Sequence, residues 1–163
     1  MTTKIILAAS MVAVFAVSMF GAAFASGHLA VVDSSVSKQG VYTTTVTVSA
    51  DIPTDTDENF GYAWFTDKGV LVATSHPVAV DSVGQKEAGD FHTHLVQLEA
   101  TGDCTSGLAV GSLTKHQIGR VSVDGSVLTI NNIPPGQTGG ISEGALAFTL
   151  SLENDRVCVN PVV

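Results

Sequence analysis

The sequence predicts an all-β protein, a single antiparallel β-sandwich of the Ig-like or Greek-key kind that follows an N-terminal signal helix. Beyond residue 25 the chain is rich in Val, Thr, Ser and Gly, which favour strands and turns over helices. Apolar and polar residues alternate over short runs, and turn residues separate these runs at regular spacing. Because no internal repeat or linker interrupts residues 26–163, we expect them to form one domain.

Two runs carry the clearest strand signals. In GVYTTTVTVSAD (40–51), the even-numbered residues from Tyr42 to Ala50 share one face, and three threonines share the other. In RVSVDGSVLTI (120–130), Asp124-Gly125 fits the two-residue loop of a hairpin. The predicted strands, in chain order, are 28–37, 40–51, 62–65, 70–75, 91–100, 108–114, the two arms of 120–130, 141–154 and 156–163. The predicted loops and turns are 52–61, 66–69, 83–90, 101–107 and 134–140.

Residues 1–25 have the three parts of a secretory signal peptide. One basic residue, Lys4, precedes a long apolar run, and Ala23-Phe24-Ala25 supplies the small residues of a cleavage site. We therefore expect an exported protein that is secreted, periplasmic or located at the cell surface. Ile5 to Ala25 is also long enough to span a bilayer, so an uncleaved membrane anchor is the alternative.

The charge of the mature chain excludes partners that are themselves anionic. Without Lys4, six basic residues stand against fifteen acidic ones, a net charge of −9 with neutral histidines. Such a surface repels nucleic acid and anionic lipid headgroups. The chain also has no phosphate loop, nucleophile elbow or zinc-protease helix, so we predict no catalytic residues.

The mature chain contains two cysteines, Cys104 and Cys158. Outside the cytoplasm an even pair predicts a disulfide, and a metal-binding or free pair is the alternative. A bridge closing a loop of this length contributes about 4 kcal/mol to stability by the chain-entropy relation.

The run FHTHLVQL (91–98) places two histidines one residue apart in a predicted strand. His92 and His94 therefore point to the same side, although both faces of this strand are mixed and neither is identified as the inner one. One interpretation is a metal site, which requires at least one further ligand, and three imidazoles suit zinc or copper. The other is a pair of ordinary strand histidines near a sheet edge. The candidates for a further ligand are His76, His116, Asp81 and Asp90.

The stretch FHTHLVQLEATGDCTSG (91–107) resembles the copper/zinc superoxide dismutases, in which a Phe-His-x-His strand is followed by a disulfide cysteine. RVCV near the C-terminus resembles the family's Arg-x-x-Cys segment, but Arg156 precedes Cys158 by two positions and not three. The resemblance implies that His92 and His94 bind copper and that Cys104 pairs with Cys158. The family's long zinc loop has no counterpart here, since LAVGSL leads directly into a strand.

A second metal hypothesis concerns the mature N-terminus. Cleavage after Ala25 would leave a chain that begins Ser26-Gly27-His28. The α-amine, two deprotonated amides and the imidazole of His28 then form a square-planar nitrogen set, which suits Cu(II) or Ni(II).

The alternative to metal binding is a structural role. A small exported sandwich with Thr-rich strands is also expected of an adhesive surface protein or a filament subunit with neither metal nor catalysis. In that case the strand 28–37 would complete a neighbouring molecule's open sheet edge, so that the protein self-associates by strand addition.

Overall fold

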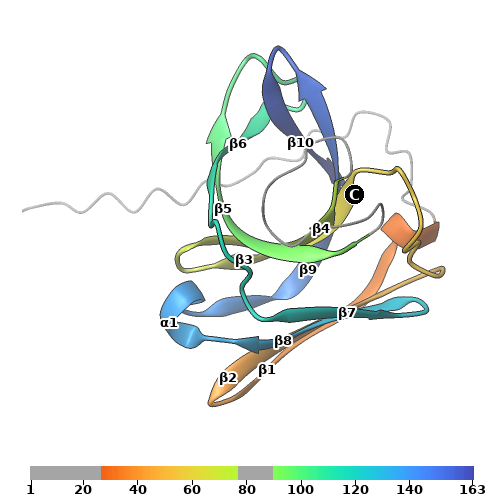
Figure 1. Ribbon diagram of the computed structural model, residues 1–163, viewed down its shortest axis with the longest axis vertical. Helices are drawn as coiled ribbons and strands as arrows, with labels where there is room; N and C mark the ends of the chain where they lie inside the picture. Colours follow the sequence, from red (N-terminus) through yellow and green to blue (C-terminus); the bar gives the residue numbers. More distant parts are fainter. Residues whose placement is uncertain (1–26, 77–89) are drawn as a thin grey trace, which may run out of the picture.

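The computed structural model describes residues 27–76 and 90–163, which form ten strands and two short helices (Figure 1). The predicted signal peptide and its cleavage site lie outside the described residues. The strands are β1 (Val31–Gln39), β2 (Val41–Val48), β3 (Phe60–Thr66), β4 (Gly69–Ser75), β5 (His92–Ala100), β6 (Leu108–Leu113), β7 (Arg120–Asp124), β8 (Val127–Ile133), β9 (Ile141–Glu153) and β10 (Arg156–Val162). The helices are a 3₁₀ turn, η1 (Gly27–Leu29), and α1 (Pro135–Thr138). No helix within the described ranges is long and apolar enough to cross a membrane.

The strands form two antiparallel sheets packed as a sandwich, which confirms the predicted fold class. One sheet has four strands in the order β1-β2-β8-β7. The other has six strands in the order β10-β6-β5-β4-β3-β9 and closes on itself because β9 also pairs with β10. In Figure 1 the four-stranded sheet lies below the closed sheet. The sequence pattern did not predict this closure.

The local patterns that predicted strands agree with the observed pairing. On β2, Thr44, Val46 and Val48 are buried, whereas the threonines between them are only partly so. The β7–β8 hairpin turns at Gly125, whose φ of 57° is the left-handed conformation that this loop requires.

The expected loop 134–140 contains the single helical turn α1. Pro135 occupies its first position, where the fixed φ of proline favours a helix and no amide hydrogen is needed. The turn is closed by the Gly139 amide, which donates to the Pro135 carbonyl at 2.8 Å.

The first predicted strand begins later than expected, at Val31 and not at residue 28. Gly27 has a φ of 64°, and the Ala30 amide donates to its carbonyl, so the chain forms the 3₁₀ turn η1. The Tyr62 hydroxyl donates to the His28 carbonyl at 2.6 Å and ties this turn to the sandwich. Burial of Tyr62 raises the pKa of its phenol, which therefore stays protonated as the donor.

The strand β1 lies at an edge of the four-stranded sheet and pairs with β2 over most of its length. Its Ser34 side chain also bonds β9, because the hydroxyl donates to the Glu143 carbonyl at 2.7 Å and accepts from the Ala145 amide at 3.1 Å. The addition of this strand to a neighbouring molecule's sheet stays a prediction.

Two apolar clusters give the sandwich its core. The first lies between the sheets and includes Val46, Val48, Leu128 and Ile130 from the four-stranded sheet and Phe60, Tyr62, Trp64 and Leu71 from the closed sheet. The second, which we call the inner cluster, consists of Val72, Val96, Phe148 and Val159 with partly buried Ala63, Val70, Leu98, Leu108, Val110 and Leu150. All six strands of the closed sheet contribute to the inner cluster, so it fills the inside of that sheet.

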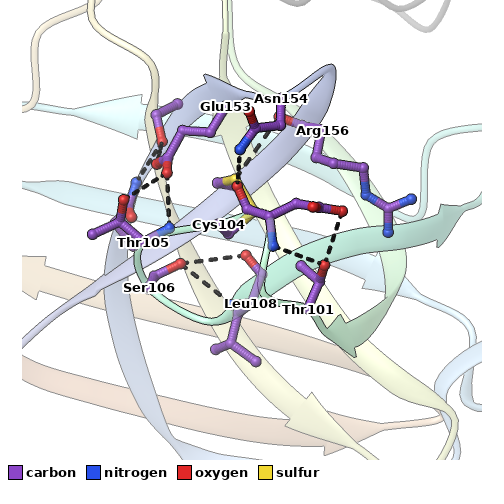
Figure 2. The surroundings of a disulfide bond; sticks show 12 residues. Thr101, Cys104, Thr105, Ser106, Leu108, Glu153, Asn154 and Arg156 are labelled. Atoms are coloured by element: carbon purple, nitrogen blue, oxygen red, sulfur yellow. Dashed lines mark hydrogen bonds between the residues drawn. A yellow bond between two sulfur atoms is a disulfide. The ribbon is translucent and has the colours of Figure 1, made fainter.

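The closed sheet is joined at a seam between β6 and β10, where Cys158 and Ala109 form a single ladder pair. The disulfide between Cys104 and Cys158 connects the loop before β6 to β10 at this seam (Figure 2). The predicted bridge is therefore present, and such bridges are typical of oxidising compartments outside the cytoplasm. The disulfide links β10 to the loop before β6, and β6 and β10 share fewer ladder pairs than the other paired strands of the closed sheet.

Side-chain hydrogen bonds surround the disulfide (Figure 2). Glu153 accepts from both the amide and the hydroxyl of Thr105 at 2.7 Å. The Thr105 amide, its hydroxyl and Ser151 together hold the pKa of the Glu153 carboxyl below its usual range. Arg156 forms an ion pair with Glu99 of β5, the second strand away from β10 in the closed sheet.

Candidate metal centre

Both faces of β5 are covered in its first half, from His92 to Val96, which explains why this part of the sequence showed no clear inner side, whereas Gln97 and Glu99 are exposed. The even-numbered residues His94, Val96 and Leu98 point into the closed sheet, where the latter two join the inner cluster. Phe91 and Leu95 point the other way and pack against the cluster between the two sheets. Because this first half lies between two apolar layers, it lacks the alternation of a half-exposed strand.

The register of β4 and β5 brings a third histidine to the first two. Thr74 pairs with His92, and His76 lies two residues beyond Thr74 on the same side of the chain. His76, His92 and His94 form what we call the histidine cluster, with exposed fractions of 6%, 0% and 1%. Among the described residues, it is the one group of three or more His, Cys, Asp or Glu side chains close enough to share an ion.

The rings of the histidine cluster converge. The Nε2 atoms of His76 and His92 are 2.9 Å apart, and one ligand nitrogen from each of the three rings lies within 4.8 Å of the others. The His92 ring is nearly perpendicular to that of His94, with centroids 4.9 Å apart. Ring nitrogens at these separations can approach a common ion with small side-chain movements, because Zn–N bonds are about 2.0–2.1 Å long.

Backbone carbonyls orient two of the rings. Nδ1 of His94 donates to the Thr114 carbonyl at 2.9 Å, and Nδ1 of His92 faces the Asp90 carbonyl at 3.4 Å. A carbonyl oxygen only accepts, so both Nδ1 atoms carry the hydrogen and Nε2 is the ligand atom of each neutral ring. Metal-binding histidines commonly donate their other nitrogen in this way.

The inner cluster borders the histidines on the inside of the closed sheet. Val72 is the ladder partner of His94, and Val72 packs with Val96 and Phe148. Imidazole rings in such surroundings offer neutral nitrogen ligands, which zinc and copper accept. Calcium and magnesium require oxygen ligands, and within residues 27–76 and 90–163 no carboxylate groups with the three histidines.

The other predicted ligands lie elsewhere or outside the described residues. His116 is exposed, and its Nε2 lies 3.5 Å from the Gln137 amide nitrogen. Asp90 contacts the cluster through its backbone carbonyl, which lies 3.4 Å from Nδ1 of His92. Asp81 lies in the segment that the structure does not describe.

His28, the predicted N-terminal ligand, does not belong to the histidine cluster. Its Nε2 lies 2.9 Å from the Glu58 carboxylate, and its ring contacts Phe60 with centroids 4.7 Å apart. If the chain begins at Ser26 and forms the square-planar site, His28 would bind the ion through Nδ1, the ring nitrogen nearer the backbone. The contact with Glu58 involves the other ring nitrogen, Nε2.

In comparisons with known proteins, no family model matches this chain, and neither a curated protein nor a solved structure shows significant similarity to it. The resemblance to the copper/zinc superoxide dismutases therefore depends on the paired strand histidines and the disulfide. Arg156, the counterpart of the family's arginine, pairs with Glu99 and not with the histidine cluster.

Sequence reasoning did not find the two carbonyls that orient the cluster, those of Asp90 and Thr114. Every residue has a backbone carbonyl, so no residue type marks this role. Only the path of the chain after β6 brings the Thr114 carbonyl to His94.

Proposed function

We propose that the protein binds a copper or zinc ion through His76, His92 and His94 in an exported, disulfide-bonded β-sandwich. The observation that carries this proposal is the convergence of three buried imidazoles, each with a ligand nitrogen within 4.8 Å of the others.

The burial of the histidine cluster supports a binding role over a packing role. Burying a polar imidazole ring gains less free energy than burying an apolar side chain in the same place. The inner cluster beside the histidines is apolar, so packing alone would favour apolar residues at these three positions too. A shared ion would give three converging imidazoles a favourable interaction that apolar side chains could not make.

The donor set favours borderline transition metals. Three nitrogen ligands suit zinc and copper, and the oriented Nδ1–H groups leave Nε2 of His92 and His94 as donors. When bound, zinc would supply a Lewis acid and copper a one-electron redox centre. The protein's own contribution is to hold the three rings in place and to shield them from bulk water.

The test is metal uptake by untagged protein purified without chelators. In a chain that carries His28→Gln, which removes the predicted N-terminal copper site, dialysis against zinc or copper followed by elemental analysis should find about one equivalent of ion per chain. His92→Gln should abolish this uptake, because it removes the ring central to the cluster. His116→Gln is the matched control, because it removes an exposed histidine outside the cluster and should leave uptake unchanged.

Thermal unfolding provides a second measurement. A ligand at 100 times its Kd stabilises the native state by about 2.7 kcal/mol, so saturating ion should raise the Tm of the wild-type chain and of His116→Gln. The proposal is wrong if the wild-type chain takes up neither ion, or if both variants lose uptake equally.

A further inference from the structure

Thr114 follows the end of β6 and is tied to β5 by three hydrogen bonds. Its amide donates to the Leu95 carbonyl at 3.1 Å, and its hydroxyl accepts from the Leu95 amide at 3.0 Å. Its carbonyl accepts from Nδ1 of His94 at 2.9 Å. The last residue pair of the β5–β6 ladder, Val96 with Leu113, lies immediately before this point.

The pattern differs from a regular antiparallel ladder in one atom. In a hydrogen-bonded pair, each residue's amide donates to the other residue's carbonyl. Here the Leu95 amide donates to the Thr114 hydroxyl and not to the Thr114 carbonyl. The side chain thus replaces the main chain as acceptor, and the carbonyl is available to bind the imidazole of His94.

We propose that Thr114 is the positioning residue of the metal centre: its hydroxyl takes the place of its carbonyl in the strand pairing, so that the carbonyl holds His94 with Nε2 directed at the ion. The expected effect of Thr114 on metal affinity rests on the proposed function. Its hydrogen bonds to Leu95 and His94 do not, because they are present in the chain without metal. A residue without a hydroxyl would return the carbonyl to the Leu95 amide, and His94 would lose its acceptor. The ring would then lose the hydrogen bond that favours hydrogen on Nδ1, and a larger share of rings would carry it on Nε2, which cannot bind a metal in that form.

Three variants separate this role from a general loss of stability. Thr114→Val removes the hydroxyl and keeps the shape of the side chain, and Thr114→Ser restores the hydroxyl. Thr66→Val is the matched control, because the Thr66 hydroxyl also bonds the backbone, donating to the Gly69 carbonyl and accepting from the Lys68 amide in the β3–β4 turn. All three are compared with the wild-type chain at equal folded fraction, which urea unfolding measures.

The first measurement is zinc affinity by competition with a chromophoric chelator. Loss of a partner that orients a metal ligand typically weakens binding 10- to 100-fold, so we expect a loss of about this size in Thr114→Val. Thr114→Ser and Thr66→Val should bind zinc as the wild-type chain does. Equal affinity in Thr114→Val and the wild-type chain, or an equal loss in Thr66→Val, would overturn the proposal.

The second measurement is the tautomer of His94 in metal-free protein, read from the ¹⁵N shifts of its ring. We expect the Nδ1–H form in the wild-type chain and in Thr114→Ser, and a mixture with the Nε2–H form in Thr114→Val. An unchanged tautomer in Thr114→Val refutes the role of Thr114. If the wild-type chain takes up no ion, the proposed function fails, whereas this measurement still decides whether Thr114 holds His94.

Discussion

Replacing Gly61 with alanine tests whether the inside of the closed sheet is as tightly packed as the structure indicates. Gly61 lies on β3, where it pairs with Thr74 on one side and with Phe148 on the other. A Cβ at this position would lie 2.4 Å from the Ala73 carbonyl oxygen and 2.8 Å from Cζ of Phe148. Both distances are shorter than van der Waals contact, so some part of the sheet must move.

The expected cost follows from which atoms are in the way. Overpacking a core typically costs about 1–3 kcal/mol, and the low end applies where a flexible side chain can move aside. Here Ala73 O and Thr74 Cα are backbone atoms of the paired strand β4, and the Phe148 ring is confined in the inner cluster. We therefore expect Gly61→Ala to lower the free energy of unfolding by about 3 kcal/mol. For a domain of about 140 residues this lowers the Tm by roughly 10 °C.

Thermal and urea unfolding followed by circular dichroism, with the disulfide intact, measure this effect. Gly144→Ala is the matched control, because Gly144 also lies in a strand and a Cβ there would meet no atom within 4 Å. Its free energy of unfolding should change by less than about 0.5 kcal/mol. If the two variants are equally stable, the close approach of β3, β4 and Phe148 is not a feature of the protein.

Three further predictions concern the seam and the N-terminus. Replacing both disulfide cysteines with serine should lower the free energy of unfolding by about 4 kcal/mol and speed amide hydrogen exchange most in β6 and β10. Because Thr105 lowers the pKa of Glu153, this carboxyl stabilises the fold above its unfolded-state pKa and loses that contribution as the pH falls through its folded-state pKa. The stability advantage of the wild-type chain over Glu153→Gln, measured by urea midpoints, should therefore be larger at neutral pH than at a pH below the folded-state pKa of Glu153. A chain that begins at Ser26 should show a visible d–d band with one equivalent of Cu(II) that His28→Gln abolishes, whereas a band unchanged in that variant would exclude the N-terminal site.

Local patterns were sufficient to predict the strands because their causes are local. The alternation in β2, the Asp124-Gly125 turn and the proline-rich segment before β9 each act within a few residues. The sandwich and the disulfide were also predicted from local features, since the spacing of the strands and a pair of cysteines after a predicted signal peptide are visible in the chain. The closure of the six-stranded sheet was not visible, because the β9–β10 and β6–β10 pairings join segments whose local patterns would suit an open sheet equally well.

The histidine cluster was likewise predicted in part from local spacing, and the rest of it depended on long-range strand pairing. The spacing of His92 and His94 placed them on one side of a strand, but the choice between His76 and His116 as their neighbour depended on long-range register. His76 joins them because Thr74 pairs with His92, and His116 lies on an exposed turn although its distance in sequence is similar. Register between strands is set by the packing of both faces against their layers, which is a property of the whole sandwich and not of any short segment. Residue types and their alternation thus gave the elements and the donors, and the packing of two layers around β5 brought the third imidazole to the other two.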